Sequence, residues 1–507
     1  MAKNSLDNKR IAQNTIFLYI RMLFVMAVNL FAVRAILDIL GVVDYGIYNV
    51  VGGVVGMFSF LSGTLATSSQ RYFSVALASK DFAKLKCQFR LNISVFLLFI
   101  FVIICIAETV GLWYVNNKMT IPSDRIMVTN IIYQLSILSF AIQLISVPYN
   151  ALIIAHEQMK AFAYIGIGEA IFKIILVLVL FIAPLDKLVT YGTMMFVSTL
   201  LITGCYYFYC KKHYPESDYK FYWNNGDAKD LIGFSGWHFL GTISVVVRSQ
   251  GINLLINAFF SPAINAARAI AFQIDTVVNQ LAGNFFVAVK PQMYKLYASK
   301  DIDEFIFLIF RSTIISVFLV SFLSIPFIIN ADFVLGLWLK HVPQYTVLFS
   351  QLVLFNGIID ATSNPTICAA LATKRIKTFY IVTGSLYIFC LPISYFALKY
   401  GYDASSTMVI SIGISLISVF ARVLVLNKLL IFPLNKYLGL FAKLLLVSIV
   451  ILVLSYLVKN LFCGKIISFL ISGVTTVILH LCLYYFVILS KKEKAIILSL
   501  IIKKIRK

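Results

Sequence analysis

Long apolar segments separated by short polar breaks run along the whole chain. Each segment is about 20 or more residues long, which is the length that an α-helix needs to cross the hydrocarbon core of a bilayer. The apolar positions are continuous and do not alternate as they would in a membrane-spanning strand. We therefore predict an all-α polytopic membrane protein with fourteen transmembrane helices, at residues 13–37, 46–70, 91–115, 126–150, 162–183, 188–210, 231–258, 267–290, 306–329, 346–368, 379–398, 405–427, 438–459 and 466–489.

The composition agrees with this pattern and excludes a soluble enzyme. Hydrophobic residues make up 61% of the chain and charged residues only 13%, with a mean hydropathy of +0.92, whereas about a quarter of a soluble domain is charged. A net charge of +22 would suggest a nucleic-acid partner in a soluble protein. In a membrane protein it reflects topology, because most Lys and Arg residues of the connections lie on the side that holds both termini. We expect cytoplasmic termini and no nucleic-acid partner.

Short motifs repeat between the two halves of the chain. ASKD at 78–81 recurs at 298–301, and GLW at 111–113 recurs at 336–338. A third set recurs at one constant spacing: Pro148, Ala155, Lys160 and Phe162 correspond to Pro365, Ala372, Lys377 and Phe379. Each half holds six predicted helices, and an even number returns the chain to the same side of the membrane. The repeat is therefore parallel, with two equivalent six-helix lobes in the same orientation.

The repeat predicts the domain organisation. We expect an N-terminal lobe at 1–210, a polar cytoplasmic linker at 211–230 and a C-terminal lobe at 231–427. Two further helices follow within 428–490, and their scarcity of polar residues suggests that they face lipid. The tail at 491–507 mixes apolar and basic residues, which is typical of an amphipathic helix on anionic lipid; a solvated tail is the alternative.

Several ionisable residues fall inside the predicted spans, where they are costly and usually functional. The cations are Arg21, Arg34, Lys173, Arg248 and Arg268, and the carboxylates are Glu169, Asp275 and Asp360. The excess of cations favours an anionic ligand, because a buried cation without a carboxylate needs another counter-charge.

Helical spacing groups the polar residues into stripes. At 100° per residue, one face of the span 267–290 carries Arg268, Asp275 and Asn279. Two other spans carry similar stripes, formed by Gln250, Asn253 and Asn257 and by Asn14, Arg21 and Asn29. The candidate substrate-binding groups in these stripes are Arg21, Asn29, Gln250, Asn253, Asn257, Arg268 and Asn279. An internal bridge between Arg268 and Asp275 is the alternative for the first stripe.

Arg34 and Arg248 point away from these stripes. Both are candidate substrate ligands by residue type, and snorkelling to the interface or pairing with backbone carbonyls is the alternative for each.

The carboxylates are candidates for ion coupling. Glu169 and Lys173 stand one turn apart, so they can form a simple ion pair or take part in coupling. Asp275 is expected to be neutralised by Arg268. Asp360 has no cation one turn away, which makes it a candidate proton or sodium site, with structural hydrogen bonding as the alternative.

Reactive chemistry is missing from the sequence. The chain has no phosphate-binding loop of the GxxxxGK[ST] type. Its 8 cysteines form no CxxC pair, and its 5 histidines are scattered. We therefore expect neither an enzyme nor a bound cofactor or metal.

Several segments resemble bacterial polysaccharide flippases of the O-antigen and capsule type, often labelled lipopolysaccharide biosynthesis proteins. These belong to the superfamily that also holds the multidrug and toxic compound extrusion (MATE) transporters and the lipid II flippase. The resemblance covers nearly the whole chain and rests on LYIRMLF at 18–24, LGVVDYGIYNVVGG at 40–53, ATSSQRYF at 66–73, FSGWHFLG at 234–241, QGINLLINAFFSPAINAARAIAFQI at 250–274 and AVKPQMYKLYAS at 288–299.

The resemblance implies a V-shaped pair of MATE-like lobes around a central cavity, two extra C-terminal helices and alternating access. It implies a cargo of oligosaccharide on undecaprenyl pyrophosphate, moved to the periplasmic leaflet of the bacterial inner membrane, and transient contacts with a polysaccharide polymerase. Cavity arginines engage the pyrophosphate in the related lipid II flippase. Here Arg21, Arg34, Arg248 and Arg268 correspond to them only as residue types on corresponding spans.

Two other functions are weighed against this one. An ion-coupled multidrug exporter of the same fold would need a cavity dominated by acids and aromatics, because its cargo is cationic. A membrane polysaccharide polymerase is disfavoured by the short outer loops.

Overall fold

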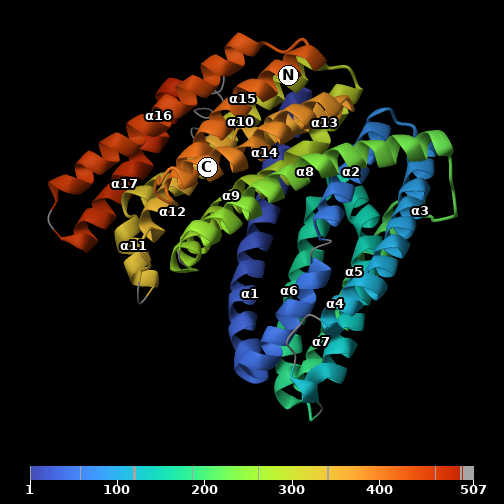
Figure 1. The fold of residues 1–507 in the computed structure, drawn as a ribbon. Helices are drawn as coiled ribbons and strands as arrows, with labels where there is room; N and C mark the ends of the chain where they lie inside the picture. The colour runs from blue at the N-terminus through green and yellow to red at the C-terminus, as the bar shows by residue number, and fades with distance from the viewer. Residues whose placement is uncertain are drawn as a thin grey trace, which may run out of the picture. The chain divides into compact units, whose positions relative to one another are not determined.

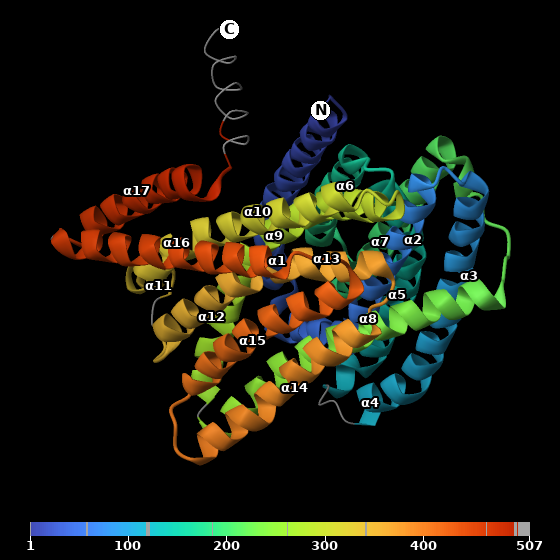
Figure 2. The same ribbon diagram turned by 90° about the horizontal axis from the view of Figure 1, so that it is seen from above.

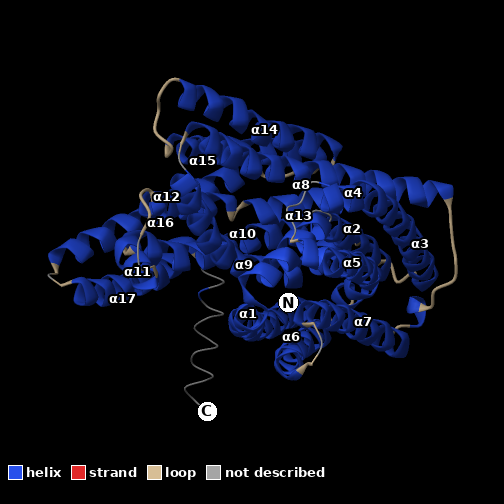
Figure 3. Ribbon diagram, turned by 60° about the horizontal axis from the view of Figure 1, so that its bottom comes forward, coloured by secondary structure: helices blue, strands red, loops and turns tan. Residues whose placement is uncertain are grey.

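The computed structural model describes residues 2–56, 59–117, 122–184, 186–260, 262–339, 342–462, 464–490 and 494. The described part of the chain is helical, with loops and no strand (Figure 3). Its α-helices are α1 (Ala2–Gly56), α2 (Ser59–Ala78), α3 (Phe82–Ile106), α4 (Leu112–Asn117), α5 (Ile126–Ala155), α6 (Met159–Ile182), α7 (Lys187–His213), α8 (Asn225–Phe259), α9 (Pro262–Ala298), α10 (Ile302–Ile329), α11 (Ala331–Trp338), α12 (Thr346–Asp360), α13 (Ser363–Thr373), α14 (Lys377–Lys399), α15 (Ser406–Leu429), α16 (Leu434–Leu461) and α17 (Lys465–Leu483). The predicted tail 491–507 lies outside the described residues apart from residue 494.

Eleven helical segments within the described residues are long and apolar enough to cross a membrane. They coincide with eleven of the predicted spans, and many of their apolar side chains are exposed, as lipid contact requires. The chain is thus a multi-pass, all-α membrane protein. The other three predicted spans, 13–37, 46–70 and 267–290, fall in α1, α2 and α9. The total of fourteen crossings stays a prediction.

The break expected between 37 and 46 is a bend inside α1. The helix continues through this stretch and changes direction at Gly41, whose φ of 74° and ψ of 171° are not helical. A side chain would be strained at this φ, so glycine allows the bend. The helix then ends at Gly56, so the predicted span 46–70 is divided between α1 and α2.

The chain divides into two compact units. The first holds residues 1–239 and 287–301, and the second holds 240–286 and 302–507. Both α8 and α9 therefore contribute residues to each unit. The lobe limits predicted from the repeat, 1–210 and 231–427, stay a prediction.

In the first unit, α1 packs against α5 and α6, and α5 packs against α2, α3 and α7 (Figure 1). Arg125 ties together the ends of these helices, because its Nη2 lies 3.0 Å from Asp44 of α1 and its Nη1 bonds Asp186. Asp186 also caps α7 by accepting from the backbone N–H of Leu188 and Val189. Burial alone would raise the pKa of Asp186, but these hydrogen bonds and the Arg125 guanidinium hold it below its usual range.

In the second unit, α10 packs against α12, α16 and α17, and the antiparallel pairs α14–α15 and α16–α17 lie side by side (Figures 1 and 2). Buried polar side chains of α17 face α10: Ser472 pairs reciprocally with Asn330, and His480 contacts Ser321 at 3.3 Å. Hydrogen bonds in an apolar surrounding hold helices together. Polar contacts therefore hold α17 against α10 and against Asn330, the residue that follows α10.

The repeated motifs form matching turns. In the two ASKD segments, Lys80 and Lys300 have φ of 55° and 60°, and Asp81 and Asp301 each donate a backbone hydrogen bond to the carbonyl five residues back. The turns before α6 and α14 match in the same way, since Glu157 and Lys374 have φ of 61° and 65°. These local similarities support the sequence repeat.

Candidate functional site

Each unit contains a cavity lined by ionisable residues predicted from the sequence. The cavity of the first unit has a volume of 470 Å³, and that of the second unit has a volume of 210 Å³. We call them the first cavity and the second cavity. The predicted residues that line the first cavity are Arg21, Glu169 and Lys173; those that line the second are Arg248, Arg268, Asp275, Asn279 and Asp360.

Hydroxyl and amide side chains dominate the polar lining of the first cavity. Polar positions recur every three or four residues along α5, and this spacing places them on one helical face. They are Ser136, Ser139, Gln143, Ser146 and Asn150; α7 adds Ser198, Thr199 and Thr203. Aromatic residues complete the wall, namely Tyr48, Phe140, Phe162 and Tyr206.

Arg21 brings a positive charge into the first cavity. Its guanidinium carbon lies 4.2 Å from the ring centroid of Phe162 on α6. Its Nε is buried and has no hydrogen-bond partner within the described part of the chain. The α6 backbone approaches at Gly166, where a Cβ atom would collide with the Arg21 side chain. Arg21 is thus held by packing against α6, and its side chain lines the first cavity.

The stripe predicted on the first span faces α6 and the turn before it. Asn14 donates to the carbonyl of Glu157 at 3.1 Å, Arg21 contacts Phe162, and Asn29 accepts from Lys173 at 3.3 Å. The prediction that these three residues share a face is therefore confirmed.

The expected ion pair between Glu169 and Lys173 is also present, with Nζ and Oε1 3.7 Å apart. The carboxylate of Glu169 is therefore paired with Lys173. Arg21 provides the remaining positive charge of the first cavity.

A helix break places Asp360 in the second cavity. α12 ends at Asp360, and α13 starts at Ser363 with Pro365 in its first turn. Proline is tolerated there because the first N–H groups of a helix have no intrahelical partner. The C-terminal end of α12 and the N-terminal end of α13 meet here, so their opposite partial charges largely cancel and the negative charge is that of the Asp360 carboxylate. This position favours a cation.

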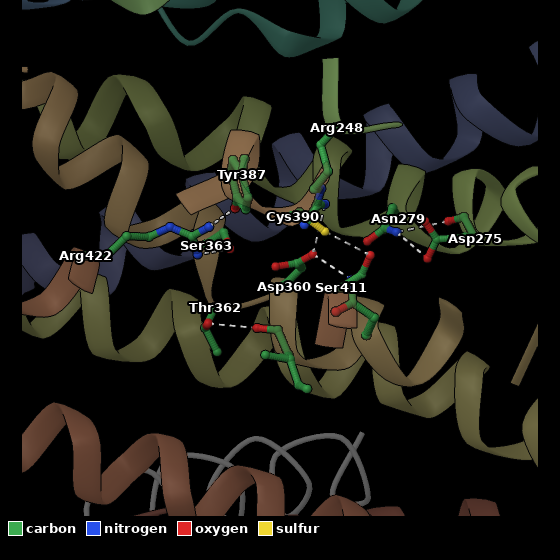
Figure 4. Close-up of polar contacts among 12 residues, drawn as sticks. Arg248, Asp275, Asn279, Asp360, Thr362, Ser363, Tyr387, Cys390, Ser411 and Arg422 are labelled. Atoms are coloured by element: carbon green, nitrogen blue, oxygen red, sulfur yellow. Dashed lines mark hydrogen bonds and ion pairs between the residues drawn. The ribbon is translucent and has the colours of Figure 1, made fainter. Parts of the chain in front are cut away.

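Arg248 supplies that cation, which corrects two predictions. Its Nη2 lies 3.9 Å from Oδ2 of Asp360, so Asp360 has a positive partner (Figure 4). Arg248 also lines the same cavity as the stripe of Arg268, Asp275 and Asn279, from which it was expected to point away. The separation indicates an ion pair and not a hydrogen bond. The Arg248 guanidinium also lies 4.4 Å from the ring centroid of Tyr387. Helical spacing missed this pair because the two residues are on different helices.

The expected neutralisation of Asp275 by Arg268 is wrong. Within the described residues, Arg268 donates to Asn253 Oδ1 at 2.8 Å and to the carbonyl of Ser249 at 3.1 Å, both on α8. Asp275 instead accepts from Asn279 at 2.8 Å. Residues seven positions apart share a helical face but are separated by about 10 Å along the axis. Arg268 instead reaches acceptors on the neighbouring helix α8.

The stripe predicted on 231–258 is only partly present in the second cavity. Asn253 bonds Arg268, whereas Gln250 and Asn257 are exposed and do not line the cavity. The side chain of Arg34 lies outside the described residues.

Sequence reasoning missed a buried arginine near the second cavity. Arg422 of α15 is 2% exposed and donates to Ser363 Oγ and to the Tyr387 hydroxyl (Figure 4). Tyr387 therefore lies between Arg248, which faces its ring, and Arg422, which bonds its hydroxyl. The sequence signal for this residue is an arginine inside an apolar span. Its place near the end of span 405–427 made an interfacial position equally compatible with the sequence.

The described residues contain no cluster of three or more His, Cys, Asp or Glu that could hold a metal ion. The two cavities are lined by charged and hydrogen-bonding side chains. The first is lined by two cations and one carboxylate, and the second by two cations and two carboxylates.

No protein-family model matches the chain, and no curated protein matches it in sequence. Solved structures do match. A MATE protein in the bent conformation superposes with a TM-score of 0.70 at 10% identity, covering 83% of this chain and 96% of the other. A mutant of the MATE transporter of Vibrio cholerae gives a TM-score of 0.66 at 13% identity, with coverages of 84% and 98%.

A third structure, an outward-facing multidrug resistance MATE family transporter of the MOP superfamily, gives a TM-score of 0.66 at 12% identity, with coverages of 83% and 96%. At these identities the likeness establishes the fold. The chain has the all-helical fold of the MATE transporters.

Proposed function

We propose that this protein is a flippase for lipid-linked oligosaccharide. It moves a polyprenyl-pyrophosphate-linked saccharide from the cytoplasmic to the periplasmic leaflet of the bacterial inner membrane by alternating access, with both termini in the cytoplasm. It acts as a transporter and carries out no covalent chemistry. A polysaccharide polymerase is a partner that would use the product.

The charge of the first cavity carries this proposal. Arg21 and Lys173 face one carboxylate, Glu169, which lies within ion-pair distance of Lys173. The guanidinium of Arg21 is left with a buried, unpartnered Nε among the described residues. Guanidinium groups bind phosphate through short, charge-assisted hydrogen bonds. A phosphate-bearing cargo therefore matches this cavity better than a cation does.

The hydroxyl and amide lining of the first cavity supports a saccharide. The three serines of α5 and their counterparts on α7 can exchange hydrogen bonds with sugar hydroxyls. Aromatic walls such as Phe162 and Tyr206 provide apolar surface for sugar rings. A site of this kind loses affinity strongly when a hydrogen-bonding partner is missing, which gives it selectivity.

Ion coupling is the second part of the proposal. Asp360 and Asp275 line the second cavity, and we assign them to a proton or a sodium ion. Glu169 and Lys173 are weaker candidates because they lie within ion-pair distance of each other. A change of charge at Asp360 would alter its pairing with Arg248.

The test is a flipping assay with purified protein in proteoliposomes. A lipid-linked oligosaccharide is placed on one leaflet, and its appearance on the other is followed with a membrane-impermeant enzyme. The proposal requires protein-dependent movement that is about 10- to 100-fold slower in Arg21→Ala. Absence of movement with the pyrophosphate-linked cargo, in a preparation that is correctly folded, contradicts it.

An ion-coupled multidrug exporter is the alternative, and the fold favours it, since one structural neighbour is described as a multidrug resistance transporter. This function requires a carboxylate that is free to meet a cationic drug. Efflux of a cationic dye by the same proteoliposomes, lost in Glu169→Gln, would support the alternative.

A further inference from the structure

One exposed face of α16 changes character along the length of the helix. Lys436, Gly439 and Lys443 are exposed near its start, and Leu446 and Val453 are 62% and 47% exposed further along. These positions follow one another at steps of three, four or seven residues, which places them on the same side of an α-helix. The face therefore presents two cations first and apolar side chains afterwards.

The helices that pack against α16 offer these two lysines few carboxylates. They are α10, α15 and α17, and residues 404–490, which include α15 and α17, contain no Asp or Glu. The acids of α10 are Asp303 and Glu304 in its first turn, about 9 Å along the axis from Phe310, whose ring packs against Tyr437 at the start of α16. Neither lysine forms a hydrogen bond or an ion pair within the described residues. Both ammonium groups are therefore open to an anion from outside the protein.

The depth of Lys443 makes such an anion favourable. This residue falls inside the predicted span 438–459, where an uncompensated charge is costly. The Cα–Cβ bonds of a helix tilt toward its N-terminus, so a lysine here extends back toward Gly439 and the membrane surface. Gly439 carries no side chain, and a Cβ atom at this position would have no neighbour within 4 Å. The ammonium groups of Lys436 and Lys443 can thus meet one anion over Gly439.

The start of α16 favours a phosphate at the level of the lipid headgroups. No side chain caps the first turn of this 28-residue helix, and the free N–H groups of a helix N-terminus carry a partial positive charge that attracts phosphate. Ile431, in the turn before α16, is 95% exposed. An apolar side chain so exposed is more stable at the membrane border than in water.

We infer that this face of α16 binds one anionic phospholipid. Lys436 and Lys443 hold its phosphate over Gly439, and an acyl chain lies along Leu446 and Val453. The apolar half of the face distinguishes this ligand from a free phosphate ion. A zwitterionic lipid brings its own cation to the phosphate and so gains less from two lysines. The site is separate from both cavities, and its occupant does not depend on which cargo the protein carries.

Lipid binding to the purified full-length protein in detergent, followed by native mass spectrometry, tests the inference. Phosphatidylglycerol and phosphatidylcholine with the same acyl chains are titrated separately. Each lysine near an anionic lipid changes the affinity by about 5-fold. We therefore expect the first phosphatidylglycerol to bind about 10-fold or more tightly than the first phosphatidylcholine.

Variants on the exposed face locate the site. Lys436→Gln and Lys443→Gln should each weaken the first phosphatidylglycerol by about 5-fold, and the double variant by about 30-fold. Gly439→Leu keeps both charges but covers the place of the phosphate, so it should also weaken binding by about 10-fold. Lys399→Gln removes an exposed lysine from the last turn of α14 and should bind as the unmodified protein does. Thermal unfolding of each variant confirms that it is folded.

Three results would overturn the inference. The first is equal affinity of the unmodified protein for the two lipids. The second is unchanged phosphatidylglycerol binding in the folded double lysine variant. The third is displacement of phosphatidylglycerol by inorganic phosphate but not by chloride at the same ionic strength, because the acyl chains would then contribute nothing. Movement of oligosaccharide lipid or of a cationic dye bears on the proposed function alone.

Discussion

The two cavities contain the same kinds of charged side chain but hold them differently. In the first cavity the carboxylate and its cation are one turn apart on α6, and Arg21 contributes from α1. In the second cavity Arg248 and Asp360 are on different helices, α8 and α12. Arg268 of α9 donates a hydrogen bond to Asn253 of α8. A pair within one helix keeps its distance when helices shift, whereas a pair between helices does not. The first cavity is therefore suited to binding and the second to switching.

The largest expected difference is between two arginines. Arg21→Ala should lower the flipping rate by about 10- to 100-fold, because a charge-assisted hydrogen bond contributes about 1.5–3 kcal/mol, and should destabilise the protein less than Arg268→Ala does. Arg21→Lys should retain partial activity, since it keeps the charge and loses the forked donors.

Arg268→Ala should abolish flipping and also destabilise the protein by about 1–3 kcal/mol, because buried acceptors on α8 lose their donor. Flipping assays and thermal unfolding in detergent check both variants. Equal destabilisation by the two changes would remove the distinction between the cavities.

Asp360→Asn should slow flipping and remove its dependence on pH or sodium. The reason is that its charge can no longer change and Arg248 loses its ionic partner. Initial flipping rates in proteoliposomes with imposed proton or sodium gradients measure this. A variant that keeps both the original rate and the original ion dependence would show that Asp360 is structural and that coupling occurs elsewhere.

Gly166→Ala should weaken cargo binding in the first cavity by about 5- to 10-fold, because the added methyl group displaces the Arg21 side chain at an overpacking cost of about 1–3 kcal/mol. Gly168→Ala is the matched control, since nothing lies within 4 Å of its added Cβ atom on the same helix. Apparent cargo affinity from concentration series checks the pair. Similar losses in both variants would mean that helix flexibility, and not Arg21 placement, is responsible.

Glu169→Gln should have the smallest effect on cargo affinity, and it should raise that affinity where the other changes lower it. Removing the carboxylate frees Lys173 and should raise the affinity for an anionic cargo by about 2- to 5-fold, a modest change because a partly exposed ion pair is worth about 1 kcal/mol or less. Apparent affinity for the lipid-linked cargo is the measurement. A fall in affinity would indicate a cationic cargo.

The sequence was most informative where a feature lies within one helix. The face shared by Asn14, Arg21 and Asn29 and the pair of Glu169 with Lys173 follow from helical spacing alone, and the structure confirms both. The long apolar segments likewise predicted the eleven helices that can cross a membrane.

Contacts between helices could not be predicted in this way. Periodicity gives the angle of a residue around its own helix but not which residues of a neighbouring helix lie at the same level. It therefore suggests Asp275 as the partner of Arg268, whereas the structure shows Asn253. The pairing of Arg248 with Asp360 needs the packing of α8 near α12, which no spacing in the chain specifies.

The most direct test of the account compares both classes of cargo in one preparation of proteoliposomes. Movement of a pyrophosphate-linked oligosaccharide lipid and efflux of a cationic dye are measured side by side, in the unmodified protein, Arg21→Ala and Glu169→Gln. The account predicts that the lipid moves, that Arg21→Ala slows it about 10- to 100-fold, that Glu169→Gln does not slow it, and that the dye stays inside. Gradient-driven dye efflux that is lost in Glu169→Gln, with no movement of the lipid, would contradict it.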